Sequence, residues 1–327
     1  MKKFTIAIHG GAGTISKKSM TPEKEAAYLQ ALNDGLTAGY DILEKNGDAL
    51  EAVKAAVIEL ENNILFNAGK GSVFTNTGTH EMDASIMDGK DLSAGAVAAI
   101  CNVRNPVELA YIVMKKSEHV FLIGKGAEEF AKQNGIAFEP DEYFFSNFRY
   151  KQWQAMKEAD EVALDHNVNP DDPDSSSAIP KAFGTEDKEK KFGTVGAVAC
   201  DANGNLAAGT STGGMTNKRF GRVGDSPIIG IGTYANNKTC AISCTGHGEP
   251  FIKAVAAYDV SCLMEYKGLS LEGAMSIVVM DKLMKIDGEG GMIGVDANGN
   301  ASLIFNSEGM YRGFCSSDGI KEVSIYK

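Results

Sequence analysis

The sequence has few features that would tie it to a metal, a membrane or a nucleic acid. Its six cysteines are scattered without a CxxC pair, so we expect buried free thiols and neither a zinc site nor a disulfide framework. No basic block offsets the formal net charge of −11, and an acidic surface repels nucleic acid and anionic membranes. The expected partner is therefore a small polar molecule.

Long hydrophobic runs are missing as well. The first apolar run, residues 4–8, is five residues long, whereas a signal-peptide core needs about seven or more and a membrane span about 20. We therefore expect a cytoplasmic protein. The 327 residues, 43% of them hydrophobic, allow one large domain or two ordinary ones.

The glycine-rich motifs for phosphate and calcium are incomplete. After the first apolar run, Ser16 stands where a dinucleotide-binding fingerprint needs its third glycine, and Gly71 stands where a phosphate loop needs Ser or Thr. The repeated Asp-Ala-Asn-Gly-Asn runs at 201–205 and 296–300 lack the sixth-position glycine of a calcium loop. His247 has no second ligand at metal spacing, which favours a loop histidine over a zinc ligand or a triad member.

What the first half does contain is an alternation of strand and helix patterns. Thr21 before Pro22 predicts the start of one helix, and a capping box of Asp48 and Glu51 predicts the start of another. The pattern predicts strands at 83–87, 94–100 and 120–123, and helices after Pro106 and at 127–133.

A change of composition marks the middle of the chain. Residues 160–191 are charged and rich in Pro and Asp, and an apolar run begins directly after Gly193. A connection of this length without structure of its own is typical of a linker or a functional loop, so we predict a linker leading to a cleavage site between Gly193 and Thr194. Cleavage there would give Thr194 a free α-amine beside its hydroxyl, which is a nucleophile with its own base.

The repeated Asp-Ala-Asn-Gly-Asn runs predict two hairpins. A type I turn closed by a glycine bulge makes Asp201 face Asn205. Counting back along the ladder then places Thr194 opposite Thr212 on one face, whereas a two-residue turn would put them on opposite faces. Helices at 249–266 and 270–286 lie between the hairpins, so we expect sheets covered by helical layers rather than a doubly wound parallel sheet.

Two polar, glycine-rich stretches could bind a substrate. In residues 244–249 the glycines expose backbone N–H groups just before a helix. In the loop at 221–227, Arg222 could bind a carboxylate and Asp225 an ammonium group, as in an amino acid. The alternative for these two residues is a surface ion pair or a turn.

Several long motifs together resemble one known family. They are His9–Gly10–Gly11–Ala12–Gly13, Asn67–Ala68–Gly69, Met82–Asp83–Ala84–Ser85, Gly193–Thr194–Val195–Gly196, and the stretches 210–217, 221–227 and 245–249. In this order they resemble the plant-type L-asparaginases, also called isoaspartyl peptidases, which are N-terminal nucleophile hydrolases. The resemblance covers nearly the whole chain and leaves out only the linker.

The resemblance implies an α+β fold, a four-layer αββα sandwich made as a self-cleaving precursor. It implies one structural domain built from two subunits. The first subunit is residues 1–193 and includes the linker at about 160–192, and the second is residues 194–327. Thr194 would be the nucleophile, supported by the Thr212 hydroxyl. The other implied site residues are Thr245 and the N–H of Gly246 as the oxyanion hole, Arg222 and Asp225 with Gly248 for the substrate α-groups, and Asn67 in the active site.

The resemblance also implies an activity and partners. The enzyme would hydrolyse β-aspartyl dipeptides and L-asparagine to L-aspartate, without a cofactor for catalysis, as a homodimer of processed units. A structural sodium ion would be held by backbone carbonyls of one loop, namely those of Leu60, Glu61, Asn63, Phe66, Ala68 and Lys70. His247 departs from the threonine of many bacterial relatives, and Phe192 from a smaller aliphatic residue. Glycosylasparaginase and a non-catalytic amino-acid-binding protein are the alternatives.

Overall fold

The computed structural model of the chain describes residues 3–15, 17, 20–159 and 193–327. The predicted linker, together with Phe192 and Ser16, lies outside the described residues. Within the described part, no helix is long and apolar enough to cross a membrane.

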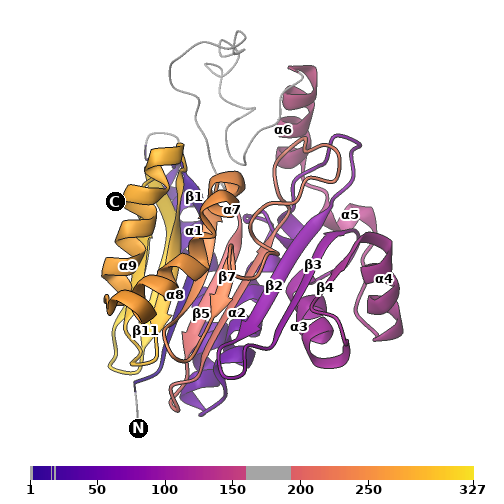
Figure 1. The fold of residues 1–327 in the computed structure, drawn as a ribbon. Coiled ribbons are helices and arrows are strands. Elements are labelled where there is room, and N and C mark those ends of the chain that lie inside the picture. The colour runs from indigo at the N-terminus through magenta and orange to yellow at the C-terminus, as the bar shows by residue number, and fades with distance from the viewer. Residues whose placement is uncertain (1–2, 16, 18–19, 160–192) are drawn as a thin grey trace.

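The described strands form two sheets (Figure 1). One has eight strands in the order β12-β11-β1-β5-β6-β2-β3-β4, and the other has four in the order β10-β9-β8-β7. Paired strands in this part of the chain run antiparallel except β3 and β4. The strands are β1 (Thr5–Gly13), β2 (Met82–Asp88), β3 (Ala94–Ile100), β4 (Phe121–Ile123), β5 (Val195–Cys200), β6 (Leu206–Thr212), β7 (Thr233–Ala235), β8 (Cys240–Gly246), β9 (Gly290–Asp296), β10 (Ala301–Phe305), β11 (Gly309–Ser316) and β12 (Lys321–Tyr326).

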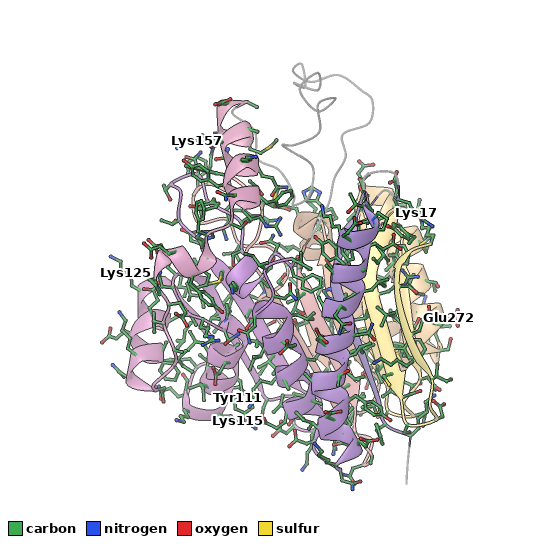
Figure 2. The ribbon with its side chains drawn as sticks, turned by 180° about the vertical axis from the view of Figure 1, so that it is seen from behind. Lys17, Tyr111, Lys115, Lys125, Lys157 and Glu272 are labelled. Carbon is green, nitrogen blue, oxygen red and sulfur yellow. The ribbon has the colours of Figure 1, made fainter. Side chains whose placement is uncertain are left out.

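Helices lie on the outer faces of both sheets. The described helices are α1 (Pro22–Glu44), α2 (Ala49–Glu61), α3 (Pro106–Lys116), α4 (Gly124–Gln133), α5 (Asp141–Phe144), α6 (Asn147–Glu158), α7 (Gly248–Ala254), α8 (Ala256–Lys267) and α9 (Leu271–Ile277), with the short turns η2 (Gly69–Gly71), η4 (Val278–Lys282) and η5 (Met284–Ile286). Helices α1, α2 and α3 pack on the larger sheet, and α1 and α2 lie side by side in the view from behind (Figure 2). Helices α8 and α9 pack on the smaller sheet, and β8 and β9 contact β1 and β5 across the space between the sheets.

The period-two alternation of the strands divides the core in two. On β1, Ile6 and Ile8 belong to the cluster under α1 and α2, whereas Ala7 belongs to the cluster between the sheets. On β5, Ala197 faces the helices and Val198 faces the smaller sheet. The helix patterns that predicted α1 and α2 are confirmed, because the side chains of Thr21 and Asp48 accept the expected backbone bonds at their N-termini. The strands and helices predicted at residues 83–133 are confirmed within a few residues.

The predicted helices of the second half differ from the structure. The helix predicted at 249–266 is broken at Val255, whose φ of 50° is left-handed. The amides of Ala257 and Tyr258 donate to the carbonyls of Ile231 and Gly230 instead of continuing the α7 ladder. Tertiary hydrogen bonds therefore decide where α8 begins.

The second of these helices also departs from its prediction. The segment predicted as a helix at 270–286 is α9 followed by a π-helical segment, η4, and a 3₁₀ turn, η5. Met284, in the last part of this segment, is 55% exposed. Sequence periodicity does not distinguish these i→i+5 and i→i+3 bonds from an α-helix, because all three carry apolar residues at similar spacing.

Both repeated turns have the predicted form, but they lie in different sheets. The amide of Asp201 donates to Asn205 O at 3.0 Å, and Gly204 has a φ of 85°. The turn between β5 and β6 lies in the larger sheet, and the equivalent turn between β9 and β10 lies in the smaller one. The sequence patterns did not single out β7, which has three residues, or β12, which is mostly exposed. All six cysteines are unpaired, and Cys101 and Cys262 are only half-buried rather than buried as expected.

Candidate active site

Thr194 and Thr212 meet at one end of the space between the two sheets. The ladder of β5 and β6 pairs Val195 with Ser211, so Thr194 and Thr212 stand at the next opposed position, as the sequence predicts. The Thr194 hydroxyl donates to Thr212 Oγ1 at 3.0 Å, and both side chains are buried. The predicted register is confirmed.

Asn67 lies at the carbonyl that would be cut. Its backbone N–H donates to Gly193 O at 3.1 Å, and its side-chain amide donates to Gly214 O at 2.7 Å. Its Oδ1 accepts from Val73 N at 3.0 Å. A Cβ on Gly213 would lie 2.4 Å from the same Oδ1, so this loop needs glycine for its close approach to Asn67.

A buried chain of side-chain hydrogen bonds extends from the other side of Thr194. His9 Nδ1 lies 3.0 Å from Thr194 O, which accepts only, so this nitrogen carries the proton. His9 Nε2 then accepts from Ser243 Oγ at 2.8 Å, and Ser243 Oγ lies 2.7 Å from Thr210 Oγ1. Complete burial lowers the pKa of His9 to about 3, so the ring is neutral. A Cβ on Gly196 would lie 2.0 Å from Ser243 Oγ, so glycine there makes room for the chain.

Thr245 and Gly246 are the last two residues of β8. Thr245 is fully buried, and its hydroxyl has no hydrogen-bond partner among the described residues. Gly246 has a φ of 154° and approaches Gly290 so closely that a Cβ would lie 2.8 Å from its Cα. The cavity encloses about 20 Å³ and is lined by Gly193, Thr194, Thr212, Gly214, Met215, Arg222, Gly224, Asp225, Ser226 and Gly246.

Arg222 and Asp225 also line this cavity, but they do not form an ion pair with each other. Arg222 donates from Nε and Nη2 to the two carboxylate oxygens of Glu249, at 3.0 and 2.8 Å. Asp225 is buried, and its Oδ2 has no partner in the described part of the chain. Burial raises the pKa of Asp225 to about 7, although the positive charge of Arg222 opposes the shift.

Gly248 leaves room between these two groups. A Cβ at this position would lie 2.9 Å from Asp225 Oδ1 and 3.1 Å from Arg222 Nη2. Gly248 is also the first residue of α7. A side chain here would push Asp225 and Arg222 apart.

The loop predicted to hold sodium joins α2 to η2. Its carbonyl oxygens converge on two glycines: a Cβ on Gly71 would lie 2.0 Å from Phe66 O, and one on Gly69 would lie 2.5 Å from Glu61 O. Carbonyl oxygens are hard donors that suit an alkali ion, so these residues fit the implied group. No cluster of His, Cys, Asp and Glu in the described ranges is arranged to hold a metal.

Comparison with known proteins identifies the family. The model of the family described as asparaginase matches residues 2–325. The chain belongs to the asparaginase family. It is 50% identical over 327 residues to an isoaspartyl peptidase of Salmonella typhimurium, covering all of both chains, and 49% identical to that of Escherichia coli, covering all of this chain and 97% of the other. It is 41% identical to a probable isoaspartyl peptidase/L-asparaginase 2 of Arabidopsis thaliana, with all of both chains covered.

In this asparaginase-family chain, the predicted site residues fall into two places. Eight of them gather at the cavity or directly beside it, namely Thr194, Thr212, Asn67, Thr245, Gly246, Arg222, Asp225 and Gly248. The predicted sodium loop adjoins it through Asn67. Sequence reasoning missed Glu249 as the partner of Arg222 and His9 as the partner of Thr194, although both residues lie inside motifs that carried the resemblance.

Proposed function

We propose that this asparaginase-family chain is an isoaspartyl peptidase and L-asparaginase that cuts itself before Thr194. The observation that carries the proposal is the hydroxyl pair of Thr194 and Thr212, 3.0 Å apart, in one cavity with Arg222 and Asp225. A nucleophile thus lies opposite groups of the right charge for the α-carboxylate and α-amine of an aspartyl substrate. The names of the relatives support the same activity.

The fold and chain organisation belong to the same proposal. Helices pack on the outer face of each sheet and the sheets pack on one another, which supports the four-layer αββα sandwich of N-terminal nucleophile hydrolases. Cleavage between Gly193 and Thr194 would divide this single structural domain into subunits of residues 1–193 and 194–327. Three further points stay predictions: the homodimer, the cytoplasmic location and the sodium ion. The sodium ion would be held by the loop carbonyls of Leu60, Glu61, Asn63, Phe66, Ala68 and Lys70.

Self-cleavage would begin in the uncut chain. The Thr194 hydroxyl attacks the carbonyl carbon of Gly193, the peptide C–N bond breaks, and the acyl group moves to Oγ as an ester. Water then hydrolyses the ester, which leaves Gly193 with a carboxylate and Thr194 with an α-amine. The N–H of Asn67, already 3.1 Å from Gly193 O, would stabilise the oxyanion of this step.

The mature enzyme would use the same hydroxyl on its substrate. The new amine accepts the Thr194 proton as Oγ attacks the β-carbonyl of an aspartyl amide or peptide. The unpartnered Thr245 hydroxyl and the N–H of Gly246 are the expected donors to the oxyanion, and one such donor is worth about 3 to 4 kcal/mol in other hydrolases. Ammonia or an amino acid leaves with a proton, and water then releases L-aspartate from the ester.

The proposal is tested by intact mass and activity of the purified protein. Wild type should split into two chains at Gly193–Thr194 and release aspartate from a β-aspartyl dipeptide and from L-asparagine. Thr194→Ala should stay whole and inactive, whereas Thr37→Ala, on the exposed side of α1, should behave as wild type. Cleavage of glycosylated asparagine in place of the dipeptide would indicate a glycosylasparaginase, and aspartate binding by an uncut, inactive chain would indicate a binding protein.

A further inference from the structure

The guanidinium of Arg222 has two edges that can donate hydrogen bonds. Glu249 occupies the side edge, because its carboxylate accepts from Nε and Nη2. The end edge, formed by Nη1 and Nη2, lies against the bare backbone of Gly224 and Gly248, where added Cβ atoms would be 3.0 Å from Nη1 and 3.1 Å from Nη2. Because a guanidinium has five N–H donors, the end edge keeps the two donors that a second carboxylate needs.

Glu249 is also contacted by a second side chain, that of His247. His247 Nε2 lies 3.1 Å from Glu249 Oε2, the oxygen that also accepts from Arg222. The backbone N–H of His247 donates to Glu289 O at 3.0 Å, which fixes the ring at the start of α7. The side chains of His247 and Glu249 are 32% and 41% exposed, so solvent protons reach the pair.

Resting on the proposed function, we propose that Glu249 and His247 are positioning residues that aim the end edge of Arg222 at the α-carboxylate of the substrate. Glu249 fixes the guanidinium through two parallel bonds, and His247 fixes Glu249. The arrangement therefore makes substrate affinity depend on Glu249 and, through Glu249, on His247.

The first experiment replaces the histidine ring. His247→Ala removes the contact to Glu249 Oε2, whereas His247→Gln keeps a donor near the place of Nε2. We expect the KM for a β-aspartyl dipeptide to rise about threefold in His247→Ala, the size of a partly exposed side-chain pair, and to stay nearer that of wild type in His247→Gln, with kcat within twofold in both. His119→Ala is the matched control, since His119 also lies beside a glutamate, Glu118, but on an exposed surface. A wild-type KM in His247→Ala overturns the role of His247.

The second experiment removes the charge of Glu249. Glu249→Gln should raise KM about tenfold and leave kcat within about twofold, because Arg222 contributes uniform binding far from the reacting carbonyl. Glu249→Asp should recover part of the loss. Glu272→Gln, which removes a surface carboxylate on α9 (Figure 2), is the control. An unchanged or lower KM in Glu249→Gln overturns the proposal, because Glu249 would then be a bystander or a competitor of the substrate.

The outcomes separate this inference from the proposed function. If wild type neither splits nor hydrolyses the dipeptide, the proposed function fails. If wild type does both and the variants keep the wild-type KM, only the positioning role fails. Gels for cleavage and thermal melts identify misfolded variants, and His247→Gln then provides a second test, because a variant that folds and keeps the donor should have a KM near that of wild type.

Discussion

At the scale of single residues, two polar side chains of the site are buried without a partner. Asp225 Oδ2 and the Thr245 hydroxyl are both in this state within the described residues. An unpaired buried polar group costs about 1 to 3 kcal/mol, so a fold keeps it where a ligand supplies the missing bond. Asp225 lines the cavity of Thr194, and Thr245 directly precedes Gly246, which lines it too, so the two groups are the expected partners of the α-amine and of the developing oxyanion of an aspartyl substrate.

The raised pKa of Asp225 makes substrate binding depend on pH. The carboxyl must be ionised to hold an ammonium group, and its pKa of about 7 means that the ionised form is lost as pH falls below 7. We expect kcat/KM for a β-aspartyl dipeptide to fall about tenfold per unit of pH below this value, because kcat/KM reports the free enzyme. The measurement is a rate profile between pH 5 and 9.

A variant supplies the check on that profile. Asp225→Asn should lose at least about 30-fold in kcat/KM at pH 8, the usual cost of truncating a buried charge pair, and its profile should lack the limb near pH 7. Asp281→Asn, on the exposed side of η4, should keep the wild-type profile. A wild-type rate that stays flat down to pH 5 would contradict the assignment of Asp225.

Some of these residues follow from the sequence and others do not. Thr212 could be placed opposite Thr194 because a turn of known type fixes the register, and a period of two fixes the face. Glu249 lies 27 residues from Arg222, and Ser243 lies 234 residues from His9. No local rule connects partners so far apart, since they meet only when the sheets pack.

At the scale of elements, the break between α7 and α8 illustrates the same limit. The sequence around Val255 continues a helical pattern, yet the structure places this β-branched residue at a φ of 50°. That conformation costs an L-residue roughly 1 to 2 kcal/mol. The hydrogen bonds from α8 to Gly230 and Ile231 offset the cost, and they are invisible to a sequence pattern.

Relieving this strain should stabilise the protein. Val255→Gly removes the Cβ clash at a site that is 44% exposed, and the net gain should be about 1 kcal/mol after the added entropy of glycine, or about 2 °C in Tm. Val120→Gly is the comparison, because Val120 is also exposed and does not have a positive φ, and it should lower Tm. A lower Tm in both variants would show that Val255 is not strained.

The loop between α2 and η2 permits a test by ion replacement. If its carbonyls hold sodium, the ion binds the folded chain alone and stabilises it by mass action. Replacing sodium by tetramethylammonium at equal ionic strength should then lower Tm by about 2 to 5 °C, because the larger cation cannot enter the loop. Equal melting temperatures in the two salts would remove sodium from the proposal.

At the scale of the whole molecule, the two sheets are joined by polar contacts at the site end and by apolar ones elsewhere. Toward the turns of the hairpins, Ala7 and Val198 fill the inter-sheet core. Toward Thr194, the space holds His9, Ser243 and Thr210, which bond in series across it. The apolar half follows from alternation in the sequence, whereas the polar half depends on which hydroxyls the packing of the sheets brings together.

This buried chain should make the fold sensitive to acid through His9. Its pKa is about 3 in the folded protein, well below the 6.5 of a free side chain. The neutral ring therefore stabilises the fold fully above pH 6.5, and about 1.4 kcal/mol is lost per unit of pH between 6.5 and 3.

His9→Asn removes the titration while its amide can still donate to Thr194 O. We expect the unfolding free energy of the parent, minus that of the variant, to fall with this slope. Urea unfolding at pH 7, 6 and 5 measures it, with both proteins in a Thr194→Ala background so that neither is cut. A parent whose unfolding free energy changes with pH in parallel with that of His9→Asn would mean that His9 is not held neutral between the sheets.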